Sequence, residues 1–364
     1  MIRNDCVHFR GDKPCRFKRV CEGCPRFEAI GPKVLMIKCR AQGDVLRTTP
    51  LLPGLRRKHP GSVISWVVDP ESVDLLDNNP YLHRVLPFNL ETVLLLQVEE
   101  FDAVYCLDKE PASTALATQV RGARKFGFGL TKDGALMIFN EAAAYAYRLG
   151  IDDDLKFRRN EKTYQQIAAE AAEVDYRGED YVFELRDEAR AKAAAFFKAK
   201  RIAGKRPAVG LNTGAGTKFE TKQWPVSYYR KLIRLLTGKL GAGVFLLGGP
   251  REKNMNKSLA RGAGPRVFNT GSDNTLLEFA GFIDRLNVVV SSDTLGMHIA
   301  IALKKKVVAL FGPTCLQEID LYGRGVKLFA GADCAPCYKQ TCPDPVCMES
   351  LSVERVFEEV RKLL

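Results

Sequence analysis

Residues 33–50 read KVLMIKCRAQGDVLRTTP, and this stretch decides which class of fold the sequence predicts. Residues 33–38 form an apolar run, which is typical of a parallel strand buried between helices. Gly43 permits a tight turn, and Asp44 stands near the start of a helix that we expect to continue through Leu55. A strand, a short turn and a helix in this order predict a βαβ unit.

The same alternation continues along the chain and indicates a parallel sheet in each half. We expect buried strands at 33–38, 63–69, 84–88, 103–108 and 125–130, and again at 208–214, 243–249, 266–271, 287–293, 307–313 and 326–331. A charged stretch at 150–164 and a helix at 187–200 lie between the two series. The predicted fold class is therefore α/β, with two Rossmann-like, doubly wound domains facing a central cleft.

The chain has 364 residues, too many for one ordinary core, so we predict two main domains with cysteine-rich ends. The predicted parts are a cysteine-rich segment at 1–30, an N-terminal domain at 31–200, a C-terminal domain at 201–333, and a cysteine cluster with a terminal helix at 334–364. The polar start lacks the apolar core of a signal peptide, and no apolar run reaches the roughly 20 residues that span a bilayer. We therefore expect a cytoplasmic protein.

The net charge of +12 restricts the class of partner. A basic chain suits nucleic acid, an anionic membrane face or a phosphorylated substrate. The basic residues are dispersed, and no nucleic-acid-binding motif is recognisable. We therefore expect an anionic substrate or an anionic membrane surface, and no nucleic acid.

The chain has 11 cysteines, most of them in two groups at the ends. The N-terminal group has C-x8-C-x5-C-x2-C spacing and the C-terminal group C-x2-C-x4-C-x4-C spacing, and their members are Cys6, Cys15, Cys21 and Cys24, and Cys334, Cys337, Cys342 and Cys347. In the C-terminal group four thiolates within 14 residues favour a structural metal site, with zinc as the default and iron as the alternative, and the N-terminal group is a second candidate site. His8 is a spare N-terminal ligand, and the competing interpretation of each group is a set of reduced thiols. We expect Cys39, Cys106 and Cys315 in the core.

Asp44 has two open roles. It either caps the helix that follows, which contributes about 1 kcal/mol, or its carboxylate takes part in chemistry. A nucleotide phosphate loop is disfavoured at this position, because the fingerprint G-x-G-x-x-G is absent. A carboxylate at the start of a helix also repels a phosphate there.

Three loops that follow strands of the second half carry candidate ligand-binding groups. Residues 210–225, GLNTGAGTKFETKQWP, offer backbone N–H groups, hydroxyls and the ammonium of Lys222, which together suit a diphosphate; the alternative is a surface loop with solvated lysines. In VVVSSDTLGMHIAIAL (288–303), Asp293 either caps a helix or binds sugar hydroxyls, and His298 is a packed core residue or a catalyst. In FLLGGPREK (245–253), Glu252 either accepts ribose hydroxyls or is exposed.

In their order and spacing, these stretches resemble bacterial glycosyltransferase family 9, the lipopolysaccharide heptosyltransferases, over roughly residues 31–350. The stretches that carry the resemblance are KVLMIKCRAQGDVLRTTP, VGLNTGAGTKFETKQWP, LLGGPRE, VVVSSDTLGMHIAIAL and VVALFGPT. The resemblance implies a GT-B arrangement, in which the N-terminal domain faces the acceptor and the C-terminal domain binds a nucleotide sugar, typically ADP-heptose. It also implies an inverting reaction without a catalytic metal.

The resemblance assigns a role to each matching position. Asp44 matches the general base that deprotonates the acceptor hydroxyl, and Lys222 matches a lysine on the donor phosphates. The donor-binding residues implied in this way are Thr213, Gly214, Lys222, Glu252, Asp293, Thr294, Gly296 and His298. Leu295 and Gly296 stand where the family usually has glycine and proline, Thr213 stands where proline is common, and Gln42 replaces an apolar residue or serine. These departures bear on the choice of donor or acceptor.

The expected function is transfer of a sugar, heptose in the first instance, from an ADP-sugar to an anionic glycolipid of the lipopolysaccharide inner core. Such an acceptor implies peripheral contact with the inner face of the inner membrane. The first alternative is a protein heptosyltransferase of the autotransporter-modifying branch, whose members carry an iron-binding cysteine motif. More distant alternatives are a dinucleotide-dependent oxidoreductase, disfavoured by the missing glycine fingerprint, and a non-catalytic metal- or nucleic-acid-binding module.

Overall fold

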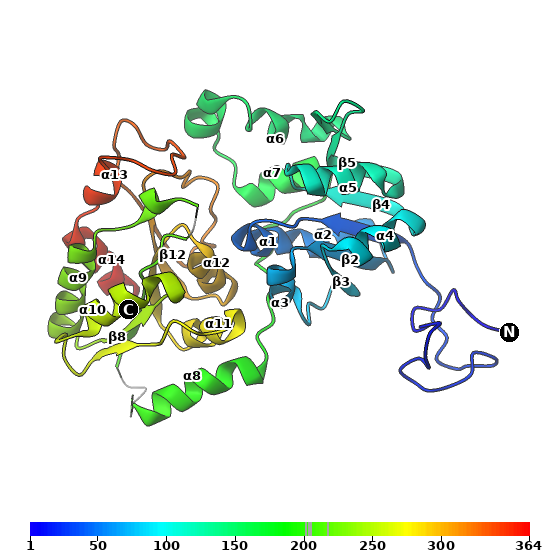
Figure 1. The fold of residues 1–364 in the computed structure, drawn as a ribbon. Coiled ribbons are helices and arrows are strands. Elements are labelled where there is room, and N and C mark those ends of the chain that lie inside the picture. Colours follow the sequence, from blue (N-terminus) through cyan, green and yellow to red (C-terminus); the bar gives the residue numbers. More distant parts are fainter. Residues whose placement is uncertain (201, 203–205, 217) are drawn as a thin grey trace. The chain divides into compact units, whose positions relative to one another are not determined.

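The computed structural model describes residues 1–200, 202, 206–216 and 218–364, and its contacts divide the chain into two compact units. The first unit comprises Met1–Ala41, Pro50–Tyr147 and Ile167–Glu179, and the second comprises Gln42–Thr49, Arg148–Gln166 and Asp180–Leu364. Each unit contains one six-stranded sheet flanked by helices (Figure 1). Residues 42–49 come early in the sequence, yet they pack with the second unit.

The sheet of the first unit has the strand order β3-β2-β1-β4-β5-β6. Its strands are β1 (Lys33–Ile37), β2 (Val63–Val68), β3 (Arg84–Pro87), β4 (Glu100–Cys106), β5 (Arg121–Leu130) and β6 (Leu136–Ile138). All neighbours are parallel except β5 and β6, which pair antiparallel. The helices in this region are α2 (Leu52–Lys58), α3 (Val73–Leu76), α4 (Leu90–Val98), α5 (Pro111–Gln119), α6 (Ala144–Arg148) and α7 (Tyr164–Ala171).

The sheet of the second unit has the order β12-β11-β10-β7-β8-β9, and its neighbouring strands are parallel. Its strands are β7 (Ala208–Asn212), β8 (Gly243–Leu247), β9 (Val267–Asn269), β10 (Val288–Ser292), β11 (Lys306–Phe311) and β12 (Gly325–Phe329). Counted from the first strand of each unit, both sheets follow the order 3-2-1-4-5-6 of the dinucleotide-binding fold. Each sheet therefore has a switch point, between β1 and β4 in one and between β7 and β10 in the other.

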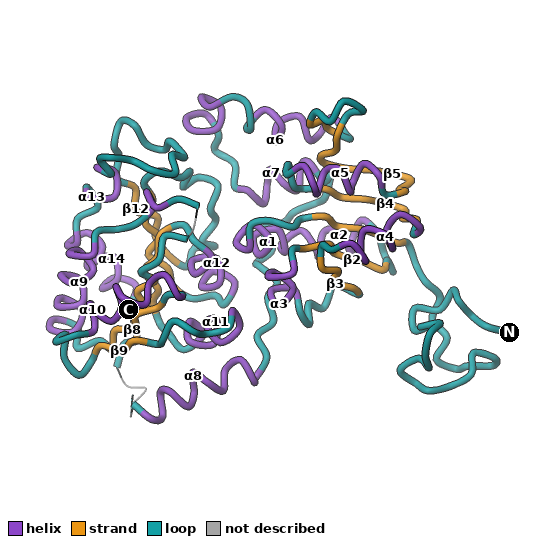
Figure 2. The backbone as a smooth tube through the Cα atoms, viewed as in Figure 1, coloured by secondary structure: helices purple, strands orange, loops and turns teal. Residues whose placement is uncertain are grey.

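The helices of the second unit are drawn with their loops in Figure 2. They are α1 (Gln42–Thr48), α8 (Asp187–Ala199), α9 (Val226–Lys239), α10 (Lys253–Ala260), α11 (Leu276–Asp284), α12 (Leu295–Ala302), α13 (Val346–Glu349) and α14 (Val353–Leu363). Short 3-10 turns are η1 (Thr49–Leu51), η2 (Pro70–Ser72), η3 (Glu141–Ala143), η5 (Glu220–Lys222) and η6 (Pro250–Glu252), and η4 (Leu155–Arg159) is a π-helix.

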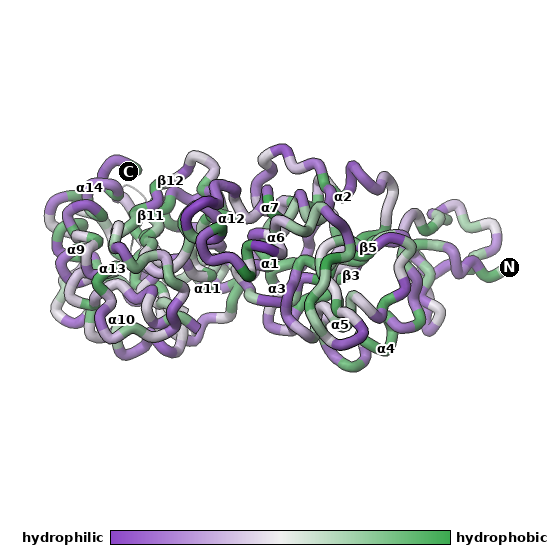
Figure 3. Tube along the Cα trace, turned by 90° about the horizontal axis from the view of Figure 1, so that it is seen from above, coloured by the Kyte–Doolittle hydropathy of each residue, from purple (hydrophilic) through white to green (hydrophobic). Residues whose placement is uncertain are grey.

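The inner strands β1, β2, β7, β8, β10 and β11 are buried along nearly their whole length, as a parallel sheet between helices requires, whereas the edge strands β3, β6, β9 and β12 are mostly only partly buried. The core of the second unit joins these strands to one face of α9 and of α14, where Val353, Val356, Phe357 and Val360 are buried. Helix α12 is different, because every residue from Gly296 to Ala302 is buried. In Figure 3 the green of hydrophobic residues gathers near the labels β5 and β11, while purple hydrophilic residues predominate on the surrounding loops.

Every strand expected from the sequence is present, with some ends displaced by a few residues, and the helix expected at 187–200 is confirmed as α8. Strand β6 was not expected, because three residues carry too little periodicity to be recognised. The single helix expected from Asp44 through Leu55 is wrong: α1 ends at Thr48, and α2 begins at Leu52. Pro50 has no N–H and disfavours helical backbone at Thr49, which accounts for the break.

Across the residues that the structure describes, none of the helices is both long and apolar enough to span a membrane.

Gly281 should be essential for packing of α8 on α11. A Cβ atom added there would lie 2.2 Å from the backbone oxygen of Ala189 in α8, so the helix itself must move. We expect Gly281→Ala to lower the stability of the second unit by about 1–3 kcal/mol, as overpacking does. Thermal or urea unfolding measures this loss.

Gly238→Ala in α9 is the matched control, because a Cβ there meets nothing within 4 Å. Alanine is the better helix former, so this variant should be as stable as the parent or more stable. Equal stability of both variants would show that contact with Ala189 does not limit residue 281.

Candidate functional site

The second unit has a cavity of about 460 Å³ at the switch point of its sheet. The cavity is lined by loops after β7 and β8 and by the starts of α11 and α12, with the residues Gln42, Asn212, Gly214, Gly216, Gly248, Gly249, Pro250, Arg251, Glu252, Asn274, Thr275, Leu276, Phe279, Thr294, Leu295 and Gly296. Its size is that of a small-molecule site. Open parallel sheets bind ligands at this edge, beyond the carboxyl ends of their strands.

The start of α12 forms one wall of this cavity. Thr294 precedes the helix with extended backbone and makes no side-chain cap, so the interpretation of Asp293 as the cap is wrong. The first amides of a helix have no partner within it, and they carry partial positive charge. Gly296 is needed here, because a Cβ atom would lie 2.6 Å from Nδ2 of Asn212. That amide donates to Ser291 Oγ and to Thr294 Oγ1, which ties the end of β7 to the start of α12.

Lys222 is fixed beside this helix start. Its Nζ donates to the backbone oxygen of Asp293, and its own carbonyl accepts from Ser292 Oγ at 2.8 Å. The ammonium therefore lies against the loop that leads into α12. Because the helix start is also positive, the two features attract the same kind of anion.

Glu252 and Thr213 have structural partners as well. Glu252 accepts from the N–H of Gly249 at 2.8 Å while its residue lines the cavity. Thr213 is fully buried and does not line the cavity, because its hydroxyl bonds Asn256 Oδ1 at 2.7 Å and the carbonyl of Leu247 at 3.1 Å. Thr213 therefore orients the loop and leaves Gly214 to face the cavity.

Helix α1 packs on α12 within the same unit. The contact is tight at Gly43, where a Cβ atom would lie 2.6 Å from Cδ2 of His298. This contact brings Gln42 to the cavity wall and places Asp44 in the following residues of the helix. Asp44 is the third residue of α1, so it is not the N-cap.

Asp44 belongs to a charged group around Arg47. The guanidinium Nε of Arg47 lies 3.0 Å from Asp44 Oδ1, and Nη1 lies 3.6 Å from Glu318 Oε2. Tyr164 stacks beneath the guanidinium, whose Cζ is 3.9 Å from the ring centre. The side chain of Asp44 is 35% exposed, whereas those of Arg47 and Glu318 are 14% and 13% exposed. Asp44 is thus the accessible member of a partly buried cluster.

Burial and charge act against each other in this cluster. Burial works to lower the pKa of Arg47, but the carboxylates of Asp44 and Glu318 outweigh it and raise that pKa. Burial raises the pKa of Glu318, and Arg47 and Lys156 only partly offset this effect. Arg47 is therefore a permanent cation beside the carboxylate of Asp44.

His298 is enclosed beneath the same cluster. Its Nδ1 lies 3.1 Å from the hydroxyl of Tyr181, and its Nε2 lies 3.7 Å from Asp293 Oδ1. Burial lowers the pKa of His298 to about 4, although Asp293 opposes the shift. His298 is neutral near pH 7, and it is a packed residue between α12 and α1.

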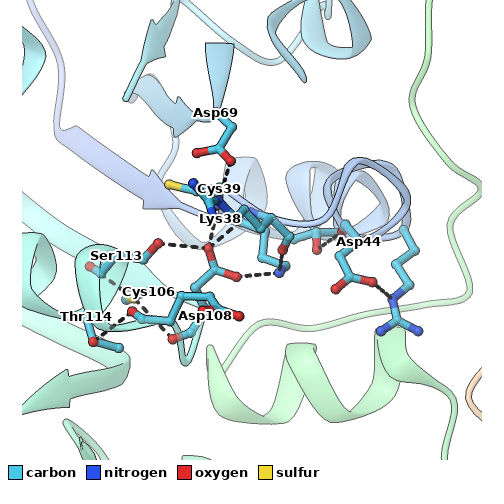
Figure 4. A network of polar contacts seen from close by, with 12 residues as sticks. Lys38, Cys39, Asp44, Asp69, Cys106, Asp108, Ser113 and Thr114 are labelled. Carbon is cyan, nitrogen blue, oxygen red and sulfur yellow. Dashed lines mark hydrogen bonds and ion pairs between the residues drawn. The ribbon is translucent and has the colours of Figure 1, made fainter. Parts of the chain in front are cut away.

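The first unit has a polar network at its own switch point. Lys38 after β1 pairs with Asp108 after β4, and both side chains are buried. Asp108 also accepts from the N–H of Cys39 at 2.6 Å and from Ser113 Oγ at 3.0 Å (Figure 4). Arg40 pairs with Asp69, which follows β2. The carboxyl ends of three parallel strands thus meet in mutually neutralised charges.

The sequence prediction missed Arg47, Glu318 and the Lys38–Asp108 pair. Arg47 stands in the quoted stretch three residues after Asp44, which is the spacing of a helical ion pair. Asp69 and Asp108 end two predicted strands, and this position was the available signal. No sequence motif marks Glu318 as a site residue. Arg251 and Phe279 also line the cavity, and Arg251 directly precedes the predicted Glu252.

The cysteines lie as expected only in part. Cys39, Cys106 and Cys315 are buried, which confirms them as core residues. Cys334 is exposed, Cys337 and Cys342 are partly exposed, and Cys347 is buried, so the C-terminal group straddles the surface. In the parts of the chain that the structure describes, no three His, Cys, Asp or Glu side chains are grouped to hold a metal ion. Metal binding at either cysteine group stays a prediction.

Comparison with known proteins agrees with this architecture. Residues 94–347 match the family described as glycosyltransferase family 9 (heptosyltransferase). The chain is 26% identical to lipopolysaccharide heptosyltransferase 1 of Pseudomonas aeruginosa over 91% of this chain and 98% of the relative. It is 28% identical to lipooligosaccharide heptosyltransferase 2 of Campylobacter jejuni, over 43% of this chain and 51% of the relative.

A solved structure is similar in fold. E. coli heptosyltransferase WaaC with ADP-2-deoxy-2-fluoro heptose superposes with a TM-score of 0.60 at 20% identity, over 91% of this chain and 100% of that structure. The likeness confirms the predicted pair of Rossmann-like α/β domains of the GT-B class.

His298 should make the stability of the second unit sensitive to acid. Its pKa is about 4 when folded and about 6.5 when unfolded, so between these values only the unfolded chain binds the proton. The folded state therefore loses about 3 kcal/mol of stability as the pH falls from above 6.5 to below 4. We expect His298→Gln to melt with a smaller pH dependence between pH 7 and 4.5.

The parent protein, measured in the same buffers, is the control. If His298→Gln keeps the pH dependence of the parent protein, the buried imidazole is not the source of the acid sensitivity.

Proposed function

The chain belongs to glycosyltransferase family 9, and from this premise we propose that it transfers heptose from ADP-heptose to an acceptor of the lipopolysaccharide inner core, with inversion at the anomeric carbon. The observation that carries the proposal is the packing of α1 on α12 through Gly43. Through it, Gln42 lines the cavity at the start of α12, and Asp44 lies one residue beyond Gly43. A candidate base thus stands beside a candidate anion site.

The cavity suits the donor. The diphosphate would bind the first amides of α12, at Leu295 and Gly296, with the ammonium of Lys222 beside them. Arg251 adds a second cation, and Phe279 offers an aromatic face to a base. The structure of WaaC was obtained with an ADP-heptose analogue, which supports this class of donor.

The proposed reaction needs one base and one stabilised leaving group. Asp44 would take the proton of an acceptor hydroxyl as that oxygen attacks the anomeric carbon. The bond from that carbon to the β-phosphate oxygen breaks, and ADP leaves with the bonding electrons. Lys222 and the start of α12 would offset the negative charge that builds on the leaving group. The proposed mechanism uses no catalytic metal.

The structure offers fewer observations on the acceptor than on the donor. A phosphorylated, membrane-held glycolipid would complement the net charge of +12, and the matched Pseudomonas aeruginosa relative is a lipopolysaccharide heptosyltransferase. Because such an acceptor is held in the membrane and the chain is basic, we also propose that the protein makes peripheral contact with the inner membrane. Radiolabelled ADP-heptose in a cell lysate separates the acceptors, because label in lipid supports the proposal and label in protein supports the protein-modifying alternative.

Asp44→Asn should abolish transfer while the donor still binds. The amide cannot accept the acceptor's proton, so we expect kcat to fall by about 10²–10⁴-fold. Affinity for ADP, measured by calorimetry, should change little, because Asp44 does not line the cavity.

Asp74→Asn is the matched control, since Asp74 is an exposed aspartate in the first turn of a helix of the first unit. It should retain full activity. Near-normal turnover of Asp44→Asn would exclude Asp44 as the base.

Lys222→Ala should weaken ADP binding. Removing a charge-assisted contact to phosphate costs about 1.5–3 kcal/mol, which corresponds to a 10- to 100-fold rise in Kd. Lys218→Ala, four residues earlier and exposed, is the matched control and should bind ADP normally. Equal losses in both variants would indicate a general effect of surface charge.

A further inference from the structure

Residues 1–30 form a segment without a core. The two ends of this segment meet in an antiparallel β-bridge between Cys6 and Ala29. The N–H of Val7 donates to the carbonyl of Glu28 at 2.9 Å, and the N–H of Ile30 donates to the carbonyl of Asp5 at 2.8 Å. Between these ends the backbone has no helix and no strand, as the teal trace near the N-terminus in Figure 2 shows. None of the 30 residues is buried. A closed loop of this size needs a covalent or metal crosslink, because it has no apolar interior.

Four cysteines supply the chemistry for such a crosslink. Cys6, Cys15, Cys21 and Cys24 all line one cavity of about 120 Å³ within the segment. All four are free thiols that are only partly exposed. They come from separate turns of the loop, so the fold of the segment, rather than sequence proximity alone, gathers them.

The same backbone hydrogen bond is present at all four cysteines. Each one accepts at its carbonyl from the N–H three residues on, at 2.9 Å in Cys6, 2.8 Å in Cys15, and 3.2 Å in both Cys21 and Cys24. Each cysteine therefore opens a β-turn. Turns of this kind direct N–H groups toward one side, where they bind anions and sulfur ligands.

The cavity is also strongly basic. Its lining includes Arg3, Arg10, Lys13, Arg19 and Arg26, and no aspartate or glutamate. Arg3 pairs with Asp5 and Lys13 with Asp12, and the positive charges of Arg10, Arg19 and Arg26 remain at a cavity whose thiols are neutral. A divalent metal with four thiolates carries a net charge of −2, which the surrounding guanidinium and ammonium groups would balance.

We propose that Cys6, Cys15, Cys21 and Cys24 bind a metal as four thiolates and that this centre holds residues 1–30 folded. Each thiol gives its proton to solvent as it coordinates, and no redox step is needed. Because the four sulfurs do not yet form a ligand set, binding must draw the turns inward around the metal. Zinc and iron share this ligand chemistry, and the test separates them. The centre is independent of the proposed glycosyl transfer, whose cavity belongs to the second unit.

The test compares the full-length protein with Cys21→Ser/Cys24→Ser and with Cys334→Ser/Cys337→Ser. Elemental analysis of each purified protein should show metal that the N-terminal variant lacks and the C-terminal variant retains. Zinc is identified by its content alone, and iron also by thiolate-to-iron absorption. Calorimetric ADP binding should be the same in all three proteins, which controls for folding of the second unit.

Limited trypsin digestion gives an independent readout, because the segment is rich in arginine and lysine. We expect chelator to accelerate cleavage within residues 1–30 several-fold in the parent protein and to change nothing in the N-terminal variant. Two results would overturn the proposal. One is equal metal content in the parent and the N-terminal variant, and the other is an intact mass that shows disulfides among the four cysteines.

Discussion

The absence of a side chain at Gly43 is the constraint on which the candidate site depends. Helix α1 can lie on α12 only because nothing larger than hydrogen separates residue 43 from the ring of His298. His298 in turn is fixed by Tyr181 and stays neutral through burial. A backbone contact thus sets where the carboxylate of Asp44 stands relative to the cavity wall, and this precision does not rely on a flexible side chain.

The second property of the site is its uneven distribution of charge. Asp44 and Asp293 act electrostatically on Arg47, Tyr181 and His298, and Glu318 acts on Arg47. Burial raises the pKa of Glu318, the most enclosed of these carboxylates, and Arg47 only partly offsets this effect. The most exposed, Asp44, has the closest contact with Arg47. The cluster therefore places the carboxylate of Asp44, its most accessible member, where solvent and ligands can reach it.

Most of the fold could be predicted because buried parallel strands leave a strong apolar signal. The strands at 33–38, 208–214 and 287–293 could be predicted for this reason, and so could the glycine turns after the first two. The grouping of residues 42–49 with the second unit could not be predicted, because a short helix does not encode its packing partner. The pairing of Arg47 with Glu318 could not be predicted either, because the two residues are far apart in sequence and only the fold brings them together. Thr213 was predicted to bind the donor, but its hydroxyl faces inward and bonds Asn256.

The two sheets share one strand order, yet their switch points differ in what they offer. In the second unit the edge between β7 and β10 is left open and lined by glycine, threonine and helix amides. In the first unit the corresponding edge is filled by Lys38 and Asp108, whose opposite charges satisfy each other (Figure 4). An anion gains little from a lysine that is already neutralised. The chain therefore contains two versions of a nucleotide-binding scaffold, and in one of them internal side chains have taken the place of the ligand.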